Sequence, residues 1–382
     1  MTPVYVTGVR GKILMGMSSV TYAHGLRIVT AREDEPMSTM RDVAERAGVS
    51  AKTVSRVMND DRYVSADVRR RVEQAIAELK YVPNQLARTF RSGRDAAIGV
   101  AIPDISDTFF ATLTREVEQI ARSRGVAVFI TSLGLDGDEE QSRVEALLGR
   151  QLTGLISTPV SGDQSYLRPW QDRTAIVFID RPPARITADS VLEDDESGAY
   201  EATRHLIGHG HRRVAFIGDR VSTTTTARRL EGYRSAIAEA GLAQDSQIVA
   251  LGYTSTAEAS KAVTDLLLLD EPPTAIFSSN AWCTIGVIPA LQRAGRHDMP
   301  LISFGDFPLA EAIQPPPSVL DQDPVAVGRV AATRLFERID HPGRRLNRKI
   351  ILPVPLILRG SCCPQPIPVT TVAQAAAAAV GP

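Results

Sequence analysis

A short segment from residue 51 to residue 59, AKTVSRVMN, carries side chains that could bind in a nucleic-acid groove. Val54 and Val57 are spaced to lie on one face of a helix and would be buried there. The side chains left on the opposite face are those of Ala51, Lys52, Ser55, Arg56 and Asn59. An alanine methyl group can contact thymine and a lysine can reach the acceptors of guanine, whereas serine, arginine and asparagine suit phosphate oxygens. The segment therefore has the chemistry to contact both base edges and the phosphate backbone.

A helix before this segment and a tight turn between the two would hold the segment in place. Thr39 is predicted to cap that first helix, and Asp42 supplies a carboxylate near its N-terminus. Gly48 would end it, because glycine adopts the left-handed conformation most easily, and Ser50 would cap the helix that follows. In such a pair of helices, the N-terminal residues of the second helix enter the major groove. The pattern thus predicts a helix-turn-helix that binds DNA.

A third helix and a local excess of positive charge support this interpretation. The helix would begin after Ser65 and present three arginines, residues 69–71, on its outer face. Its inward-facing residues would be Val68, Val72, Ile76 and Leu79. Residues 39–94 contain 12 Lys and Arg against 7 Asp and Glu, although the whole chain has a formal net charge of −1. Phosphate binding requires such a concentration of charge. From these residues alone, a small helical domain that docks onto another protein is the alternative.

The 382-residue chain shows no motif of an enzyme or of a metal centre. It contains no Gly-rich dinucleotide loop, no P-loop and no nucleophile elbow, so we expect neither catalysis nor a cofactor. Its three cysteines, Cys283 and the adjacent Cys362 and Cys363, have no metal-site or disulfide spacing, which favours a reducing compartment. His205 and His209 have the spacing of a zinc-binding pair but lack a third ligand. A histidine-rich helix C-terminus is explained by the helix dipole instead.

The two ends of the chain differ in character from the rest. Residues 1–38 include a short apolar patch that mimics a secretion signal but is too short for one, so we expect an unstructured extension. Met37 and Met40 stand directly before the helix-turn-helix and are alternative start sites. The alanine-rich segment 362–382 is expected to be a tail without structure. No apolar run is long enough to cross a bilayer.

From Ala97 onwards, short apolar runs alternate with amphipathic segments, as in AIGVAI followed by a helix from Phe109 to Arg124. This alternation predicts parallel sheets built from strand-helix-strand units. It occurs twice, which indicates two similar α/β lobes. In such sheets ligands bind beyond the carboxyl ends of the strands. Polar residues follow the predicted strands at Asp180, Asp219, Asn280 and Asp306. For each of them, a role in a turn or a cap is the alternative.

Together these segments resemble the lactose/galactose repressor family of transcriptional regulators over residues 39–361. The resemblance rests on MRDVAERAGVSAKTVSRVMN, VSADVRRRVEQAIAELKYVPNQLARTFRSGR, GHGHRRVAFIGD and LPVPLILRGS. It implies an N-terminal all-α helix-turn-helix domain (39–83), a hinge helix and linker (84–95) and a two-lobed α/β core (96–361) with parallel sheets, like a periplasmic binding protein. The protein so implied is a cytoplasmic repressor that binds operator DNA as a homodimer, or as a tetramer of two dimers. A small molecule in the core would set its affinity for DNA.

The resemblance also implies which residues bind DNA. They are Thr39, Ser50, Ala51, Lys52, Thr53, Ser55, Arg56, Asn59, Tyr63, Asn84, Ala87, Arg88 and Phe90. Phe90 stands where the family has a leucine that wedges between bases at the operator centre, and a phenylalanine can also unstack a base step. Packing of Phe90 against the core is the alternative.

The implied effector contacts are Phe109, Phe110, Asp180, Arg229, Phe277 and Asn280. Two positions depart from the family pattern, because Ala281 and Gly305 stand where the family usually has aspartates. A hydrogen bond to a charged group contributes about 1.5–3 kcal/mol, so we expect an unusual sugar or a less hydroxylated metabolite. A constitutive DNA-binding protein with a non-functional cleft is the main rival interpretation, and a solute-binding protein is a weaker one.

Overall fold

The computed structural model describes residues 22–23, 26–27, 38–58, 61–81 and 97–362. The chain divides into two units, Met1–Arg91 and Ser92–Pro382. The predicted hinge helix and the predicted C-terminal tail after Cys362 lie outside the described residues. In the predicted N-terminal extension, β1 (Tyr22–Ala23) pairs antiparallel with β2 (Leu26–Arg27). These four residues depart from the expectation of a segment without structure.

Three short helices make up the first unit: α1 (Met40–Ala47), α2 (Ala51–Met58) and α3 (Ala66–Glu78). Thr39 begins α1 through a capping box, since its hydroxyl accepts from the Asp42 amide while the Asp42 carboxylate accepts from the Thr39 amide at 2.6 Å. Gly48 ends α1 with a φ of 64°. The caps and the turn predicted from the sequence are thus confirmed. The buried core of this unit consists of Val43, Ala44, Ala47, Val54, Val57, Val72 and Ala75.

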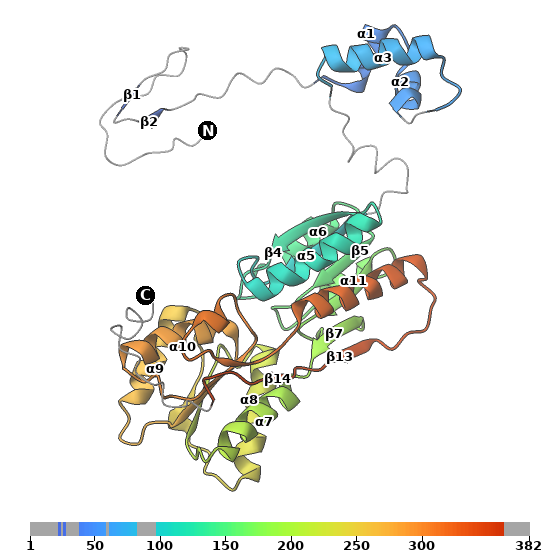
Figure 1. The fold of residues 1–382 in the computed structure, drawn as a ribbon. Coiled ribbons are helices and arrows are strands. Elements are labelled where there is room, and N and C mark those ends of the chain that lie inside the picture. The colour runs from blue at the N-terminus through green and yellow to red at the C-terminus, as the bar shows by residue number, and fades with distance from the viewer. Residues whose placement is uncertain (1–21, 24–25, 28–37, 59–60, 82–96, 363–382) are drawn as a thin grey trace, which may run out of the picture. The chain divides into compact units, whose positions relative to one another are not determined.

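A six-stranded parallel sheet forms the first lobe of the second unit (Figure 1). In spatial order its strands are β13 (Lys349–Leu352), β7 (Asp189–Glu193), β6 (Ala175–Ile179), β5 (Gly154–Ser157), β3 (Ala97–Ile102) and β4 (Ala127–Ser132). Ile98 and Val100 of β3 pack with α5 (Thr108–Ser123) and α11 (Pro324–Asp340), which lie side by side on one face. Ala101 packs with α6 (Glu140–Leu148) on the other face. Successive residues of this buried strand therefore pack against the helices on opposite faces of the sheet.

A second six-stranded sheet forms the other lobe. In spatial order its strands are β14 (Leu356–Ile357), β12 (Ser318–Leu320), β11 (Leu301–Phe304), β10 (Ala275–Ser278), β8 (Val214–Ile217) and β9 (Val249–Ala250), and only β14 runs antiparallel to its neighbour. Helices α7 (Asp195–Gly208) and α8 (Thr224–Glu239) cover one face. Helices α9 (Thr256–Leu267) and α10 (Ala281–Arg293) cover the other. Short 3₁₀ turns lie at Ser165–Trp170, Ser246–Ile248 and Ala310–Ala312. The prediction of two parallel α/β lobes is confirmed.

The chain crosses between the lobes three times, between β7 and α7, between β12 and α11, and between β13 and β14. Cys362 is buried in the core of the second lobe, so that core extends one residue past the predicted boundary at residue 361. Among the described residues, no helix is both long and apolar enough to cross a membrane.

Candidate nucleic-acid interface and interlobe cleft

The start of α2 presents the side chains that the sequence predicts for base contact. Ala51 and Lys52 are exposed, Ser55 is half-buried, and Val54 and Val57 lie in the core beneath them. The predicted division of this helix into an outer and an inner face is therefore confirmed. Ser50 begins the helix, since its hydroxyl accepts from the Thr53 amide at 3.1 Å and also bonds to the Thr53 hydroxyl.

Several arginines of the outer face also bond to neighbouring segments of the first unit. Arg56 donates to the Asp61 carboxylate at 2.8 Å, and this bond lowers the pKa of Asp61. Arg69 donates to the Asp61 carbonyl at 3.1 Å, and Arg71 donates to the Ala47 carbonyl at the end of α1 at 3.3 Å. The predicted outer face of α3 is confirmed for Arg70 and Arg71, which are exposed, whereas Arg69 is half-buried.

The remaining predicted DNA contacts differ in their surroundings, and some lie outside the described residues. The Thr39 hydroxyl is engaged in the cap of α1. Tyr63 is 74% exposed, and the Arg62 guanidinium lies over its ring. Asn59 and the four predicted hinge contacts lie outside the described residues: Asn84, Ala87, Arg88 and Phe90.

A cleft of about 320 Å³ opens between the two lobes of the second unit. Five of the six predicted effector contacts line it, namely Phe109, Phe110, Asp180, Arg229 and Asn280. They come from residues that follow β3, β6 and β10 and from α8, so the rule that ligands bind beyond the carboxyl ends of parallel strands locates the cleft correctly.

Phe277 is the exception and corrects the prediction. It is fully buried inside β10, where its ring packs edge-on against Phe216 with centroids 5.7 Å apart. It belongs to the core beneath α7 and α8 and is absent from the cleft lining. A residue within a central strand faces a covering helix layer, whereas only residues past the strand end reach the cleft.

Arg229 is held rigidly at the base of the cleft. Its Nε donates to the Asp195 carboxylate at 2.7 Å and its Nη1 donates to the Ser279 carbonyl at 2.7 Å. The guanidinium carbon lies 3.6 Å from the centroid of the Phe304 ring, a cation-π arrangement. Arg229 is only 4% exposed. The guanidinium thus has a fixed orientation before any ligand arrives.

Carboxylates outnumber the available cations around this cleft. Asp180 holds a left-handed backbone with a φ of 63° and pairs with Arg181 at 3.2 Å. Burial raises the pKa of Asp107 and of Asp219. Glu193, beneath the cleft, is 1% exposed, and burial raises its pKa well above the ordinary value. Hydrogen-bond donors or positive charge in the cleft would stabilise the ionised form of these buried carboxyl groups.

Two lining residues were not predicted from the sequence. Trp282, at the start of α10, donates from its indole Nε1 to the Asp107 carboxylate across the cleft at 3.2 Å. Gln322, in the crossover between β12 and α11, lies beside Gly305, where an added Cβ would come 2.5 Å from its Oε1. The Gln322 amide therefore occupies the space of the side chain that Gly305 lacks. The only sequence signal for Trp282 was its place two residues after Asn280.

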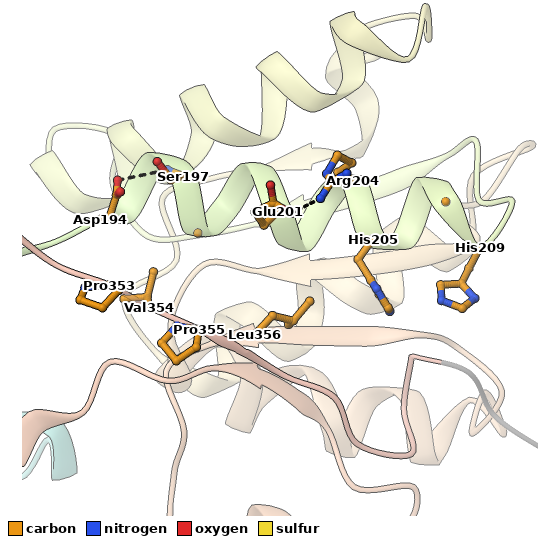
Figure 2. A pocket seen from close by; sticks show the side chains of 12 residues that line it. Asp194, Ser197, Glu201, Arg204, His205, His209, Pro353, Val354, Pro355 and Leu356 are labelled. Atoms are coloured by element: carbon orange, nitrogen blue, oxygen red, sulfur yellow. Dashed lines mark hydrogen bonds and ion pairs between the residues drawn. The ribbon is translucent and has the colours of Figure 1, made fainter.

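A separate hollow of about 710 Å³ lies along α7 in the second lobe (Figure 2). His205 of α7 and His209, directly after it, line the hollow on the side of the helix where the segment Pro353–Leu356 lies, with their ring centroids 4.5 Å apart. Burial lowers the pKa of His205. Within the described part of the chain, no three His, Cys, Asp or Glu side chains are grouped so that they could hold a metal ion.

Each of the two units contains a segment that matches a known protein family. The family described as "Bacterial regulatory proteins, lacI family" matches residues 39–84, and the family described as "Periplasmic binding protein-like domain" matches residues 203–362. The ribose operon repressor of Escherichia coli (strain K12) is 33% identical over 332 residues, which cover 85% of this chain and 100% of that protein. The HTH-type transcriptional repressor PurR of Aliivibrio salmonicida (strain LFI1238) is 29% identical over 317 residues, covering 81% and 95%.

Among solved structures, the lac repressor dimer bound to operator and the anti-inducer ONPF is similar with a TM-score of 0.71. The two are 26% identical, and the match covers 85% of this chain and 99% of that chain. These relatives match this chain over both the helix-turn-helix unit and the two-lobed core. The chain therefore belongs to the lacI family of DNA-binding transcriptional repressors, whose members regulate genes and are not enzymes.

Proposed function

We propose that this repressor reads the bases of its operator with the side chains at the start of α2. Ala51 and Lys52 occupy the first two positions of the helix and are exposed, which is where helix-turn-helix proteins contact base edges. Ser55 and Arg56 follow one turn later and suit phosphate contact, with Arg56 shared between the DNA and Asp61. The exposed start of α2 above a closed valine core is the observation that carries this proposal.

The operator is bound by two copies of the chain, as in the relative solved as a dimer on its operator. Two readers related by a twofold axis fit a near-palindromic site. The hinge contacts predicted at Asn84, Ala87, Arg88 and Phe90 complete this proposal. Pairing of two dimers into a tetramer, and a place in the cytoplasm on chromosomal DNA, belong to it as well.

The ligand of the cleft is proposed to be a small molecule rich in hydrogen-bond donors, such as a sugar. Both arginines at the base of the cleft already bond to aspartates, Arg229 to Asp195 and Arg181 to Asp180. The lining thus offers more acceptors than donors, and hydroxyl groups satisfy acceptors without adding charge. Phe109 lines the cleft beside them and suits the apolar face of a sugar ring. One relative is named as a repressor of a ribose operon, which supports this class.

Ligand and operator would be linked through the relative position of the lobes. The described lobes are joined across the cleft by the bond from Trp282 to Asp107 and by an ion pair between Arg220 and Asp136. A ligand that binds one lobe arrangement more tightly than the other shifts the population by that difference in affinity. Operator DNA responds to the same equilibrium, so ligand and DNA affect each other's affinity equally.

Selection of bound fragments from a genomic library tests the first proposal. We expect recovery of a near-palindromic site, and Lys52→Ala should weaken binding to it by about 1–3 kcal/mol and relax the preference at one base pair. Arg212→Ala, at an exposed arginine of the core, is the control and should bind as tightly as the parent. If the parent protein recovers no preferred sequence, the proposal is wrong.

Isothermal calorimetry tests the second proposal, with D-ribose, D-glucose and their phosphate esters as probes. We expect a neutral sugar to bind at least about tenfold more tightly than its phosphate ester, a difference of about 1.4 kcal/mol. Asp180→Asn keeps the side-chain shape and tolerates the left-handed backbone, and it should weaken sugar binding. Asp163→Asn, outside the cleft lining, is the matched control. Tighter binding of the phosphate esters would refute the proposed ligand class.

A further inference from the structure

The amino-terminal edge of the first-lobe sheet carries a concentration of arginines. The loops that lead into β4, β5, β6 and β13 are residues 124–126, 149–153, 171–174 and 341–348, and Asp172 is their only acidic residue. Their basic residues are Arg124, Arg150, Arg173, Arg344, Arg345 and Arg348. Because these strands are parallel, the loops gather on one edge of the sheet, opposite the edge that lines the cleft. We call this surface the basic edge.

Four of these six arginines are not neutralised by a neighbouring acid among the residues that the structure describes. Arg124 pairs with Asp340 at 2.6 Å, and Arg344 lies 3.8 Å from Glu337. For Arg150, Arg173, Arg345 and Arg348, no carboxylate partner is found in the described part of the chain, and all four are exposed. Their guanidinium groups therefore keep their full positive charge towards solvent.

A groove on the basic edge gives two of these charges a concave setting. It has a volume of about 590 Å³ and is lined by Arg173 and Arg348 together with the hydroxyl residues Thr174 and Thr187, and Asp172 lines it as well. Arg338 also lines it, but its guanidinium binds the buried Asp189 carboxylate through two bonds of 2.6 and 2.9 Å. Guanidinium and hydroxyl groups are the side chains that most often bind phosphate oxygens.

We infer that the basic edge binds the phosphate backbone of the DNA that flanks the operator. The positive charge is spread over four loops, which suits an extended polyanion better than a single small anion. The chain also enters the core here, because Ala97 begins β3, between β4 and β5. The 15 residues from 82 to 96 separate Ala97 from Tyr81, and a chain of that length spans at most about 50 Å. The reader is therefore joined to the core at this edge, through a segment no longer than that.

The inference rests on operator binding as proposed above, and duplex length distinguishes the two. The full-length protein is titrated by fluorescence anisotropy against a duplex limited to the selected operator and against one extended by about two helical turns on each side. The titrations run from about 50 to 200 mM KCl. We expect the parent protein to bind the extended duplex more tightly and with a steeper salt dependence, by about 0.9 in the log-log slope for each added phosphate contact.

The triple variant R173Q/R345Q/R348Q should lose this gain and bind both duplexes as the parent binds the short one. The control variant R212Q/R234Q/R293Q removes three exposed arginines from the second lobe and should keep the gain. Circular dichroism and thermal melting of both variants check that they fold. A triple variant that keeps the full gain, or a parent protein without one, would overturn the inference. Absence of any preference for the operator itself would overturn the proposed function and the inference with it.

Discussion

The two ends of the first-lobe sheet carry opposite charge, although the same strands run between them. At the carboxyl end, Asp107 and Asp180 line the cleft and Glu193 lies buried beneath it. At the amino end, the loops carry six arginines and one aspartate. The strand interiors between the two ends, such as Ile98 and Val100, are uncharged and fully buried. Strand interiors therefore hold the fold, while each end is chemically independent and can be altered separately.

Buried carboxylates at the two ends differ in how fully they are paired. Asp189, at the basic edge, receives two bonds from Arg338 and has Arg334 at 3.5 Å. Asp195, at the base of the cleft, is bonded to Arg229. The Oε2 atom of Glu193 has no hydrogen-bond partner among the described residues. The cleft end is thus the part of the sheet where charge is least compensated.

The largest expected effect comes from removing Arg229, the one buried cation among the described residues that line the cleft. Arg229→Met leaves Asp195 buried without its partner, and breaking a buried ion pair from one side costs about 3–5 kcal/mol. We expect the free energy of unfolding to fall by that amount in urea denaturation near neutral pH. Arg338→Met is the matched control at the basic edge, where Arg334 stays near Asp189 and the loss should be smaller. An equal loss in both variants would contradict the difference between the two ends.

A carboxyl group at the cleft end should also make the free energy of unfolding depend on pH. Burial raises the pKa of Asp195 to about 6 from an ordinary value of 3.8. Between these values the folded chain keeps a proton that the unfolded chain has released. The stabilising contribution of this carboxyl is therefore complete below about pH 4 and is lost as the pH rises through 6.

Asp195→Asn removes this titration. The free energy of unfolding of the parent, measured relative to the variant, should decrease by about 2–3 kcal/mol between pH 4 and pH 7. Urea denaturation of both proteins across that range measures it, and taking the difference cancels the other titrating groups. A difference that is constant with pH would show that Asp195 keeps its ordinary pKa in the folded chain.

The sequence predicts those parts of the fold whose causes lie close together along the chain. The cap at Thr39 and the turn at Gly48 depend on residues within one helical turn, and both are confirmed. Strands β7 and β12 were not predicted, because they are short and contain buried polar residues. Asp189 of β7 is paired by Arg338, 149 residues away, and Ser318 of β12 by Ser361, 43 residues away. Such partners cannot be seen in a local pattern.

The candidate site shows the same limit. Asp180 and Asn280 were found because they follow strands, and strand ends can be recognised from apolar runs. Phe277 was misassigned, since its place within a strand buries it in the core. Trp282 was missed because its contact with Asp107 joins residues 175 positions apart. The closure of two lobes creates that contact, and no single segment encodes it.

A smaller effect tests how crowded the carboxyl end of the second-lobe sheet is. Gly305 has a φ of 89°, and an added Cβ would lie 2.5 Å from Gln322 Oε1. Gly305→Ala should lower the free energy of unfolding by about 1–3 kcal/mol, through backbone strain and this close contact together. Gly252→Ala is the matched control, because Gly252 has a φ of 94° with no atom within 4 Å of the added Cβ. If both variants melt at the same temperature, Gln322 moves aside and the contact contributes nothing.

The smallest effect on stability is expected where the lobes touch, and fluorescence should detect it better than melting. The chain has two tryptophans, so Trp170→Phe leaves Trp282 as the only indole. In that background, Asp107→Ser keeps a cap for the Phe109 amide at the start of α5 but is too short to reach the Trp282 indole. Stability should drop by less than about 1 kcal/mol, while the Trp282 emission shifts to longer wavelength as water replaces the carboxylate. Asp107→Asn should shift the emission as well, because Asp107 accepts from the Phe109 amide with Oδ1 and from the Trp282 indole with Oδ2, and asparagine has only one oxygen. An emission maximum that is the same for the serine variant and for the Trp170→Phe background would mean that Asp107 does not hold Trp282 across the cleft in solution.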